Sequence, residues 1–186
     1  MNKKKEDREM PQLTKFAPMA ELEKRIGYTF KNKSILEEAL THSSYSNELN
    51  QRHIERNCNE RLEFLGDSVL SIIVSEYLYY EFGNEPEGKL TNRRRELVCE
   101  KALARYATKL HLGDFLMLGK GEDKNGGRQN KSILADAFEA LLAAIYLASS
   151  LFVSSTPGFV VMQLNMNGMD GISIPVNGNL LVCMFL

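Results

Sequence analysis

The segment NERLEFLGDS, residues 59–68, decides how this chain is expected to fold. Glu63 and Asp67 are four positions apart, so on a helix both carboxylates point to the same side. Leu62 and Val69 fall on the remaining surface, where they can pack against a second helix. The segment therefore predicts a helix that buries one face and presents two acids beside it.

A second acidic segment, ADAFEALL at residues 135–142, repeats this arrangement much later in the chain. Asp136 and Glu139 are three positions apart, and Phe138 and Leu142 supply an apolar surface. Two such helices facing each other would bring four carboxylates together, and their mutual repulsion would raise pKa values and destabilise the fold. A cation between the carboxylates relieves this repulsion. Oxygen ligands without nearby His or Cys favour Mg²⁺ or Mn²⁺ over zinc.

Either acidic pair alone also fits an ordinary solvated helix face. The surrounding sequence, however, resembles the ribonuclease III family: residues 59–68 are similar to its signature, and SILADAFEALLAAIYL (residues 132–147) to its second acidic helix. Further matches follow in the family's order, namely GYTF (27–30), ALTHSSY (39–45), EG (87–88), LV (97–98) and GG (126–127). The resemblance covers residues 20–148 and implies an all-α, ribonuclease III-like helical endonuclease domain.

This resemblance also implies a function. A member of the family is expected to be a metal-dependent endoribonuclease that hydrolyses double-stranded RNA to 5′-phosphate and 3′-hydroxyl ends, in RNA processing such as ribosomal RNA maturation. It assigns Glu63, Asp67, Asp136 and Glu139 as catalytic acids that hold Mg²⁺, with Mn²⁺ as a substitute. Two such cations activate water and stabilise both the transition state and the leaving oxygen. The family works as a homodimer, and a two-fold protein can place one site against each RNA strand.

Other motif residues have weaker assignments. Glu60 is similar to a family acid near substrate, but Asn57 followed by Glu60 fits an N-terminal capping box equally well. Glu87 matches a further family acid, although an exposed loop glutamate is more often uninvolved. His42 is predicted to be structural rather than catalytic, and Gly66 is predicted to allow close helix packing.

The apolar periodicity predicts helix after helix. The expected helices are residues 21–26, 33–41, 60–82 and 91–110, followed by the second acidic helix; residues 43–57 are expected to be a loop or broken helix, and residues 119–130 a loop.

Composition fits one modest globular domain, with 44% apolar residues, 25% charged residues and a net charge of −1. Basic residues nevertheless recur in clusters: Arg93-Arg94-Arg95, then Lys101, Arg105 and Lys109, then Lys120, Lys124, Arg128 and Lys131. Such clusters can meet phosphates or simply form solvated helix faces. Cys58, Cys99 and Cys183 are far apart and lack CxxC spacing, which predicts reduced thiols in a cytoplasmic protein.

The two ends differ from the body of the chain. Residues 1–19 are charged and are expected to be a flexible leader without a signal peptide. Residues 149–186 contain one charged residue, Asp170, and form an apolar tail with an irregular fold and no recognised domain, in which some segments could pair as strands. No apolar run reaches the ~20 residues of a membrane span.

The family usually continues into a double-stranded-RNA-binding domain, and residues 149–186 do not resemble one. Functions other than cleavage therefore stay open. The alternatives are a dimeric RNA-binding module without cleavage, a truncated inactive nuclease, and a small maturation nuclease of the family.

Overall fold

The computed structural model describes residues 18–150 and two short strands, at residues 175–176 and 179–180. Its elements are α1 (Met19–Ile26), α2 (Lys33–Ala39), α3 (Ser43–Asn50), α4 (Glu60–Glu81), α5 (Glu87–Leu97), α6 (Glu100–Lys109), the 3₁₀ helix η2 (Leu112–Phe115), α7 (Lys120–Lys124), the 3₁₀ helix η3 (Gly127–Gln129), α8 (Lys131–Ser150), β1 (Pro175–Val176) and β2 (Asn179–Leu180). The predicted all-α class is confirmed for the body of the chain.

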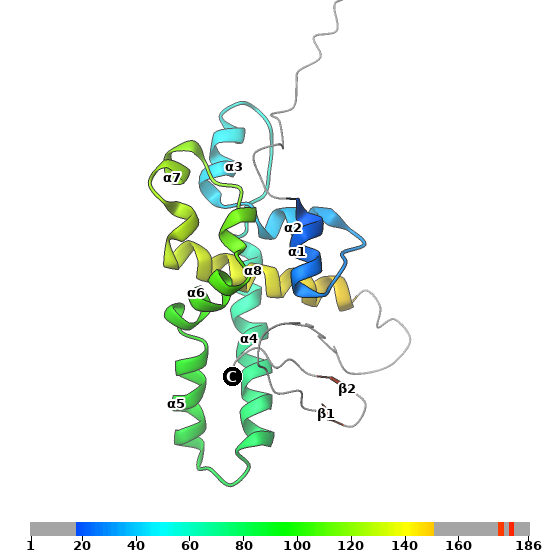
Figure 1. Cartoon of the computed structure of the whole chain (residues 1–186), viewed down its shortest axis with the longest axis vertical. Helices are drawn as coiled ribbons and strands as arrows, with labels where there is room; N and C mark the ends of the chain where they lie inside the picture. Colours follow the sequence, from blue (N-terminus) through cyan, green and yellow to red (C-terminus); the bar gives the residue numbers. More distant parts are fainter. Residues whose placement is uncertain (1–17, 151–174, 177–178, 181–186) are drawn as a thin grey trace, which may run out of the picture.

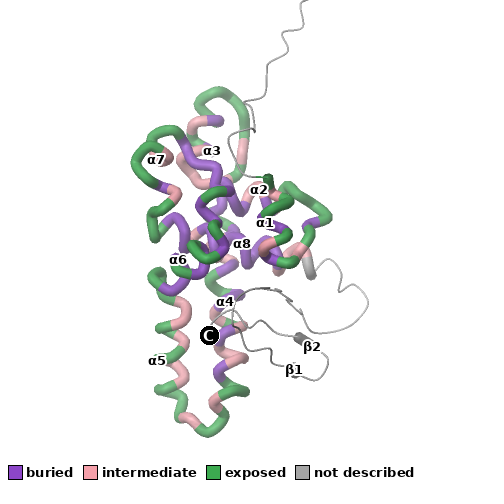
Figure 2. Tube along the Cα trace, viewed as in Figure 1, coloured by how far each residue is buried: buried purple, intermediate pink, exposed green. Residues whose placement is uncertain are grey.

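Helices α4 and α8 form the centre of the fold. Helix α4 runs along the long axis of the molecule, and α8 crosses its upper part (Figure 1). Buried residues concentrate where these helices meet α6 (Figure 2). On α4 the buried positions are Leu62, Gly66, Val69, Leu70, Val74 and Leu78, which follow the spacing of one helix face. The acidic segments identified from sequence therefore belong to the two helices on which the core is built.

The lower half of α4 extends beyond the crossing with α8 (Figure 1), although Val74 and Leu78 stay buried there. Helix α5 lies beside it and has no buried residue, and the pair extends below the other helices (Figures 1 and 2). The predicted stop after residue 82 is confirmed, since α4 ends at Glu81 and Pro86 caps the start of α5.

The single helix predicted for residues 91–110 is wrong. The chain forms α5 and α6 instead, separated by Cys99, whose backbone is extended at φ −74° and ψ 153°. The carbonyl of Cys99 then accepts hydrogen bonds from Ala102 and Leu103 and starts α6. Because α5 follows α4 while α6 packs its apolar face on α8, one straight helix cannot make both contacts.

The segment expected to be a loop or a broken helix forms a helix in its first part, and the loop expected at residues 119–130 also contains helices. Residues 43–50 form α3, and residues 119–130 contain α7 and η3. These short elements are held by contacts between distant parts of the chain: Lys120 N donates to Glu48 Oε1 (2.5 Å), and Gly119 N to Ser44 Oγ (2.9 Å). Local sequence does not reveal such contacts, so local propensity underestimates the helix content.

The expected pairing of strands in the tail occurs at one place, where β1 and β2 form an antiparallel pair. The rest of the tail and the leader lie outside the described residues, apart from Pro18, Met19 and the end of α8. No helix in the described part of the chain combines the length and apolar character needed to cross a membrane.

Candidate metal centre

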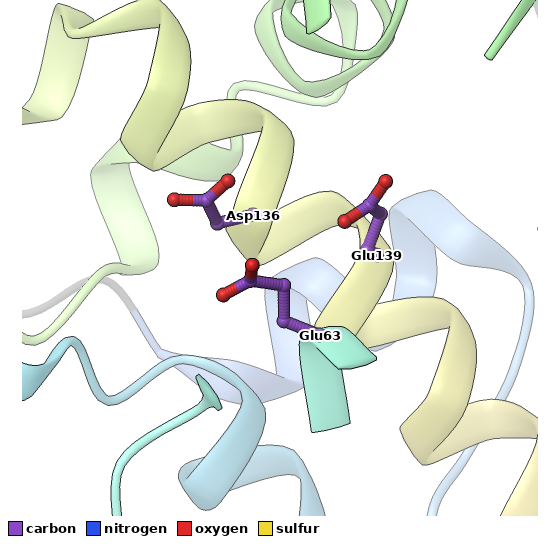
Figure 3. Close-up of side chains that lie close together, drawn as sticks. All are labelled: Glu63, Asp136 and Glu139. Atoms are coloured by element: carbon purple, nitrogen blue, oxygen red, sulfur yellow. The ribbon is translucent and has the colours of Figure 1, made fainter. Parts of the chain in front are cut away.

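Three of the predicted acids meet where α4 and α8 cross. Glu63 comes from the first turns of α4, and Asp136 and Glu139 come from successive turns of α8 (Figure 3). One carboxylate oxygen from each lies within 4.8 Å of the others. The helical spacing seen in the sequence therefore produces a compact three-carboxylate group, which we call the acidic centre.

Gly66 makes this close crossing possible. A Cβ atom at Gly66 would lie 2.0 Å from the backbone oxygen of Glu139, a separation that no side chain can occupy. Glu63 is one turn before Gly66 on α4, so the point of closest approach lies next to the acids. The prediction that Gly66 allows close helix packing is confirmed.

The carboxylates of the acidic centre are electrostatically crowded. Burial, followed by repulsion from Asp67, Glu63 and Asp136, raises the pKa of Glu139 from 4.5 to about 7. Burial is also the largest cause that raises the pKa values of Glu63 and Asp136. None of the ion pairs among the described residues involves these three acids. The centre therefore has unbalanced negative charge that a proton or a cation would neutralise.

Asp67 lies beside the acidic centre rather than within it. It follows Glu63 by one turn of α4, its side chain is exposed, and its charge is the strongest single electrostatic cause that raises the pKa of Glu139. Glu60 is likewise exposed, and its charge contributes to the raised pKa of Glu63. Both acids are thus close enough to act on the centre without belonging to the compact group.

The capping box, which was the alternative interpretation of Asn57 and Glu60, is not formed. The residue that caps α4 is Asn59, whose carbonyl accepts a hydrogen bond from Glu63 N (2.8 Å). Asn57 Nδ2 donates instead to Glu38 Oε2 (3.2 Å), which fixes the preceding loop to α2. The side chain of Glu60 makes no cap contact, so the capping role that competed with a role near the substrate does not apply.

Glu87 is far from the acidic centre within one chain. It is the first residue of α5, at the opposite end of α4 from Glu63, and a rise of 1.5 Å per residue puts it roughly 25 Å away. Its carboxylate accepts a hydrogen bond from Thr91 Oγ1 (2.6 Å). The structure of the single chain therefore gives Glu87 a local contact and no contact with the other acids.

Two residues that sequence reasoning did not assign to the site act on Asp136. The charge of Glu100, the first residue of α6, raises the pKa of Asp136, and His42 lowers it. Neither position shares a helix with Asp136, so helical spacing carried no signal of these neighbours. Only the packing of α6 and of the segment before α3 around α8 reveals them.

The chemistry of the acidic centre suits a hard divalent cation. The available ligands are carboxylate oxygens, and the group contains no thiolate or imidazole. The raised pKa values show that the carboxylates are arranged at a cost that a bound cation would offset. This arrangement fits a cation bound between α4 and α8.

Comparisons with known proteins identify the family and agree with the fold. Residues 32–157 match the family described as Ribonuclease-III-like. The chain is 57% identical over 130 residues to Ribonuclease 3 of Caldanaerobacter subterraneus subsp. tengcongensis, covering 70% of this chain and 56% of that protein. It is 51% identical over 127 residues to Ribonuclease 3 of Enterococcus faecalis, covering 68% of this chain and 54% of that protein.

A comparison with solved structures also matches the chain to a ribonuclease III nuclease domain. The nuclease domain of ribonuclease III from Campylobacter jejuni, in a structure concerned with flexibility in a region involved in dimer formation, aligns with a TM-score of 0.66 and 42% identity. The alignment covers 73% of this chain and 89% of that domain. The chain spans little more than half the length of the curated relatives it matches.

Replacing Gly66 with Ala is expected to destabilise the fold by about 1–3 kcal/mol, because the new methyl group pushes α4 away from the Glu139 backbone. Denaturant unfolding of the metal-free protein measures the change. Gly88→Ala is the matched control, since nothing lies within 4 Å of the position that its Cβ would take and Ala favours helix α5. Equal stability of Gly66→Ala and wild type would contradict the assigned contact.

Metal-free protein is expected to lose stability as pH rises. Glu139 titrates near pH 4.5 when unfolded and near pH 7 when folded, so between these values the folded state holds more protons and the free energy of unfolding falls with pH. Urea unfolding between pH 5 and pH 7.5 measures this slope. Glu139→Gln should show a flatter dependence, and parallel curves for the two proteins would contradict the raised pKa.

Proposed function

The chain belongs to the ribonuclease-III-like family, and we propose that it is a metal-dependent endoribonuclease that hydrolyses the phosphodiester bonds of double-stranded RNA. The proposed products carry 5′-phosphate and 3′-hydroxyl ends, and the proposed setting is RNA processing such as ribosomal RNA maturation. The observation that carries this proposal is the convergence of Glu63, Asp136 and Glu139 within 4.8 Å at the crossing of two helices.

The proposed cofactor is Mg²⁺, with Mn²⁺ as a substitute. Glu63, Asp136 and Glu139 would hold the cation, with Asp67 completing the ligand set from the exposed side. A bound divalent cation supplies Lewis-acid chemistry to a phosphate and lowers the pKa of water. The acids must be ionised for this role, so Glu139, whose pKa is raised to about 7, would have to be deprotonated to hold the cation. Glu60 stays at the edge, where its charge acts through Glu63.

The proposed substrate is supported by exposed basic side chains. Three arginines of the basic clusters make contacts within the fold. Arg93 pairs with Glu85 (2.8 Å), Arg94 donates to Ser75 Oγ (2.9 Å), and Arg128 pairs with Asp123 (2.8 Å). Exposed members that can meet RNA phosphates are Arg95, Lys101, Lys109, Lys124 and Lys131. We assign Glu87 to RNA contact or to the surroundings of the site in the assembled enzyme, because it does not approach the acidic centre of its own chain.

The proposed assembly is a homodimer formed through α4. Phe64 is 79% exposed, Ile72 68% and Tyr79 67%, which is unusual for large apolar side chains on one helix. A second copy would bury this surface, and two-fold symmetry would present one acidic centre to each strand of an RNA duplex.

The proposed domain limits place the nuclease domain at residues 20–148, between a leader and the apolar tail, although the family match extends to residue 157. The proposed location is the cytoplasm, where Cys58 and Cys99, both free thiols in the structure, would remain reduced.

Glu139→Gln is expected to reduce Mg²⁺-supported cleavage of duplex RNA by more than about a hundredfold, since loss of an outer partner of a metal ligand alone costs 10–100-fold. The variant should keep its fold and be more stable than wild type without metal at pH 7.5, because a crowded charge is gone. Cleavage is measured on an end-labelled duplex. Glu81→Gln, at the exposed far end of α4, is the matched control and should cleave normally.

Near-normal cleavage by folded Glu139→Gln would contradict the carboxylate assignment. Wild-type protein that binds duplex RNA without cutting it would identify a binding module instead. A wild-type protein that elutes as a monomer and does not cleave would indicate a truncated, inactive nuclease.

Removal of residues 158–186 is expected to leave cleavage within about twofold and to raise the soluble yield, because this segment lies beyond the family match and has one charged residue. Duplex cleavage per milligram of soluble protein and elution volume measure the outcome. Loss of both activity and solubility would show that the tail covers apolar surface of the domain.

A further inference from the structure

Arg128 lies in η3, just before the helix that carries Asp136 and Glu139, and its guanidinium forms hydrogen bonds in two directions. Nε donates to Asp123 Oδ1 of α7 (2.8 Å), and Nη1 donates to the carbonyl of Gly113 in η2 (2.7 Å). The side chains of Arg128 and Asp123 are 18% and 19% exposed, so solvent screens this ion pair weakly. Arg128 thereby ties two short elements, α7 and η2, to the segment that leads into α8.

Gly113 is held between Arg128 and α8. A Cβ atom at Gly113 would lie 2.2 Å from the backbone oxygen of Arg128 and 3.5 Å from Cδ2 of Leu134, so η2 packs closely against both. Leu134 is buried near the start of α8, two positions before Asp136. The hydrogen bond from Arg128 to the Gly113 carbonyl therefore secures a contact that reaches the part of α8 from which Asp136 extends.

Asp136 lies between two close contacts of α8. On one side Leu134 packs near Gly113, and on the other side the backbone of Glu139 lies against Gly66 of α4. Two fixed points determine both the position of a helix and its tilt, and they therefore determine where the Asp136 carboxylate lies in the acidic centre. Loss of the first contact would allow α8 to tilt about the second.

We propose that Arg128 is a positioning residue for the acidic centre, because it holds η2 against the start of α8 and thereby fixes the place of the Asp136 carboxylate. This inference rests on the proposed function, since the place of Asp136 affects activity only if the centre binds a cation and cleaves RNA. A small displacement of a reacting group lowers the rate even when the substitution that causes it is remote from the chemistry.

Two substitutions separate the two directions of the guanidinium contact. Arg128→Lys keeps a positive charge for Asp123, but an ammonium lacks the planar fork that also reaches Gly113 O. Asp123→Asn removes the ion pair and keeps the hydrogen bond from Arg128 to Gly113. Both variants should lower the metal-free melting temperature, whereas only Arg128→Lys should displace the start of α8.

Duplex cleavage by the full chain with Mg²⁺, well below the melting temperature of every variant, tests this separation. For Arg128→Lys, kcat should fall about tenfold or more because a reacting group is misplaced, and the KM for RNA should stay within about twofold. For Asp123→Asn, both constants should stay within about twofold.

A second measurement needs no RNA. In a thermal-unfolding titration with Mn²⁺, the half-saturating concentration should rise about threefold or more for Arg128→Lys, since a displaced ligand no longer fits the cation. It should stay at the wild-type value for Asp123→Asn.

Arg25→Lys is the matched control. Arg25 of α1 makes the same two kinds of contact, with the carboxylate of Glu21 and with a backbone carbonyl, Leu110 O (3.0 Å). The substitution should lower the melting temperature as well, but it should leave kcat and the half-saturating Mn²⁺ concentration within about twofold of wild type.

Wild-type kcat and cation affinity in Arg128→Lys would overturn the proposal. An equal loss of kcat in Arg25→Lys or Asp123→Asn would also overturn it, since general loosening of the fold would then be the cause. A rise in KM alone would assign Arg128 to RNA contact instead. Failure of the proposed function gives a different result: wild type then neither cleaves duplex RNA nor gains stability from the cation, and the role of Arg128 falls with it.

Discussion

The close crossing of α4 and α8 at Gly66 is the constraint on which the rest of the structure depends. The backbone of Glu139 occupies the space that any Cβ at position 66 would need. Two helices this close bring side chains from neighbouring turns into one small volume, so Glu63, Asp136 and Glu139 cannot avoid one another. The same contact that packs the core therefore concentrates negative charge at its edge.

The repulsion between these carboxylates opposes folding, and the packing of the surrounding helices offsets it. Helix α8 is apolar along most of its length, and its buried alanines, Ala135, Ala137, Ala140, Ala143 and Ala144, allow neighbouring helices to approach closely. The hydrophobic area buried around α8 holds the acids in place even though burial raises their pKa values. A cation bound between these carboxylates would relieve their repulsion, so the crowded charge would favour cation binding at the acidic centre.

The sequence predicted these central helices well because their signals are local. Apolar residues and acids at helical spacing placed Glu63, Asp136 and Glu139 on facing surfaces. The resemblance to ribonuclease III assigned these acids to one catalytic group. The errors occur where structure depends on distant contacts. Helix α7, where a loop was expected, is held against α3 through Ser44 and Glu48, and the break at Cys99 follows from two packing directions that no local pattern encodes. For the same reason Glu100 was not identified and His42 was predicted only as a structural residue, since each acts on Asp136 from a different element.

Helix α4 has two halves with different tasks. Its first turns carry the acidic centre and pack against α8, while its last turns lie beside α5, where Leu78 is buried and Tyr79 and Tyr80 are exposed. Phe64 breaks this division, because it is 79% exposed although it is adjacent to Glu63. In the proposed dimer, a partner that covers Phe64 would also immobilise the turn that carries Glu63. Assembly and metal binding would then stabilise the same turn of helix, so each would favour the other without any further conformational change.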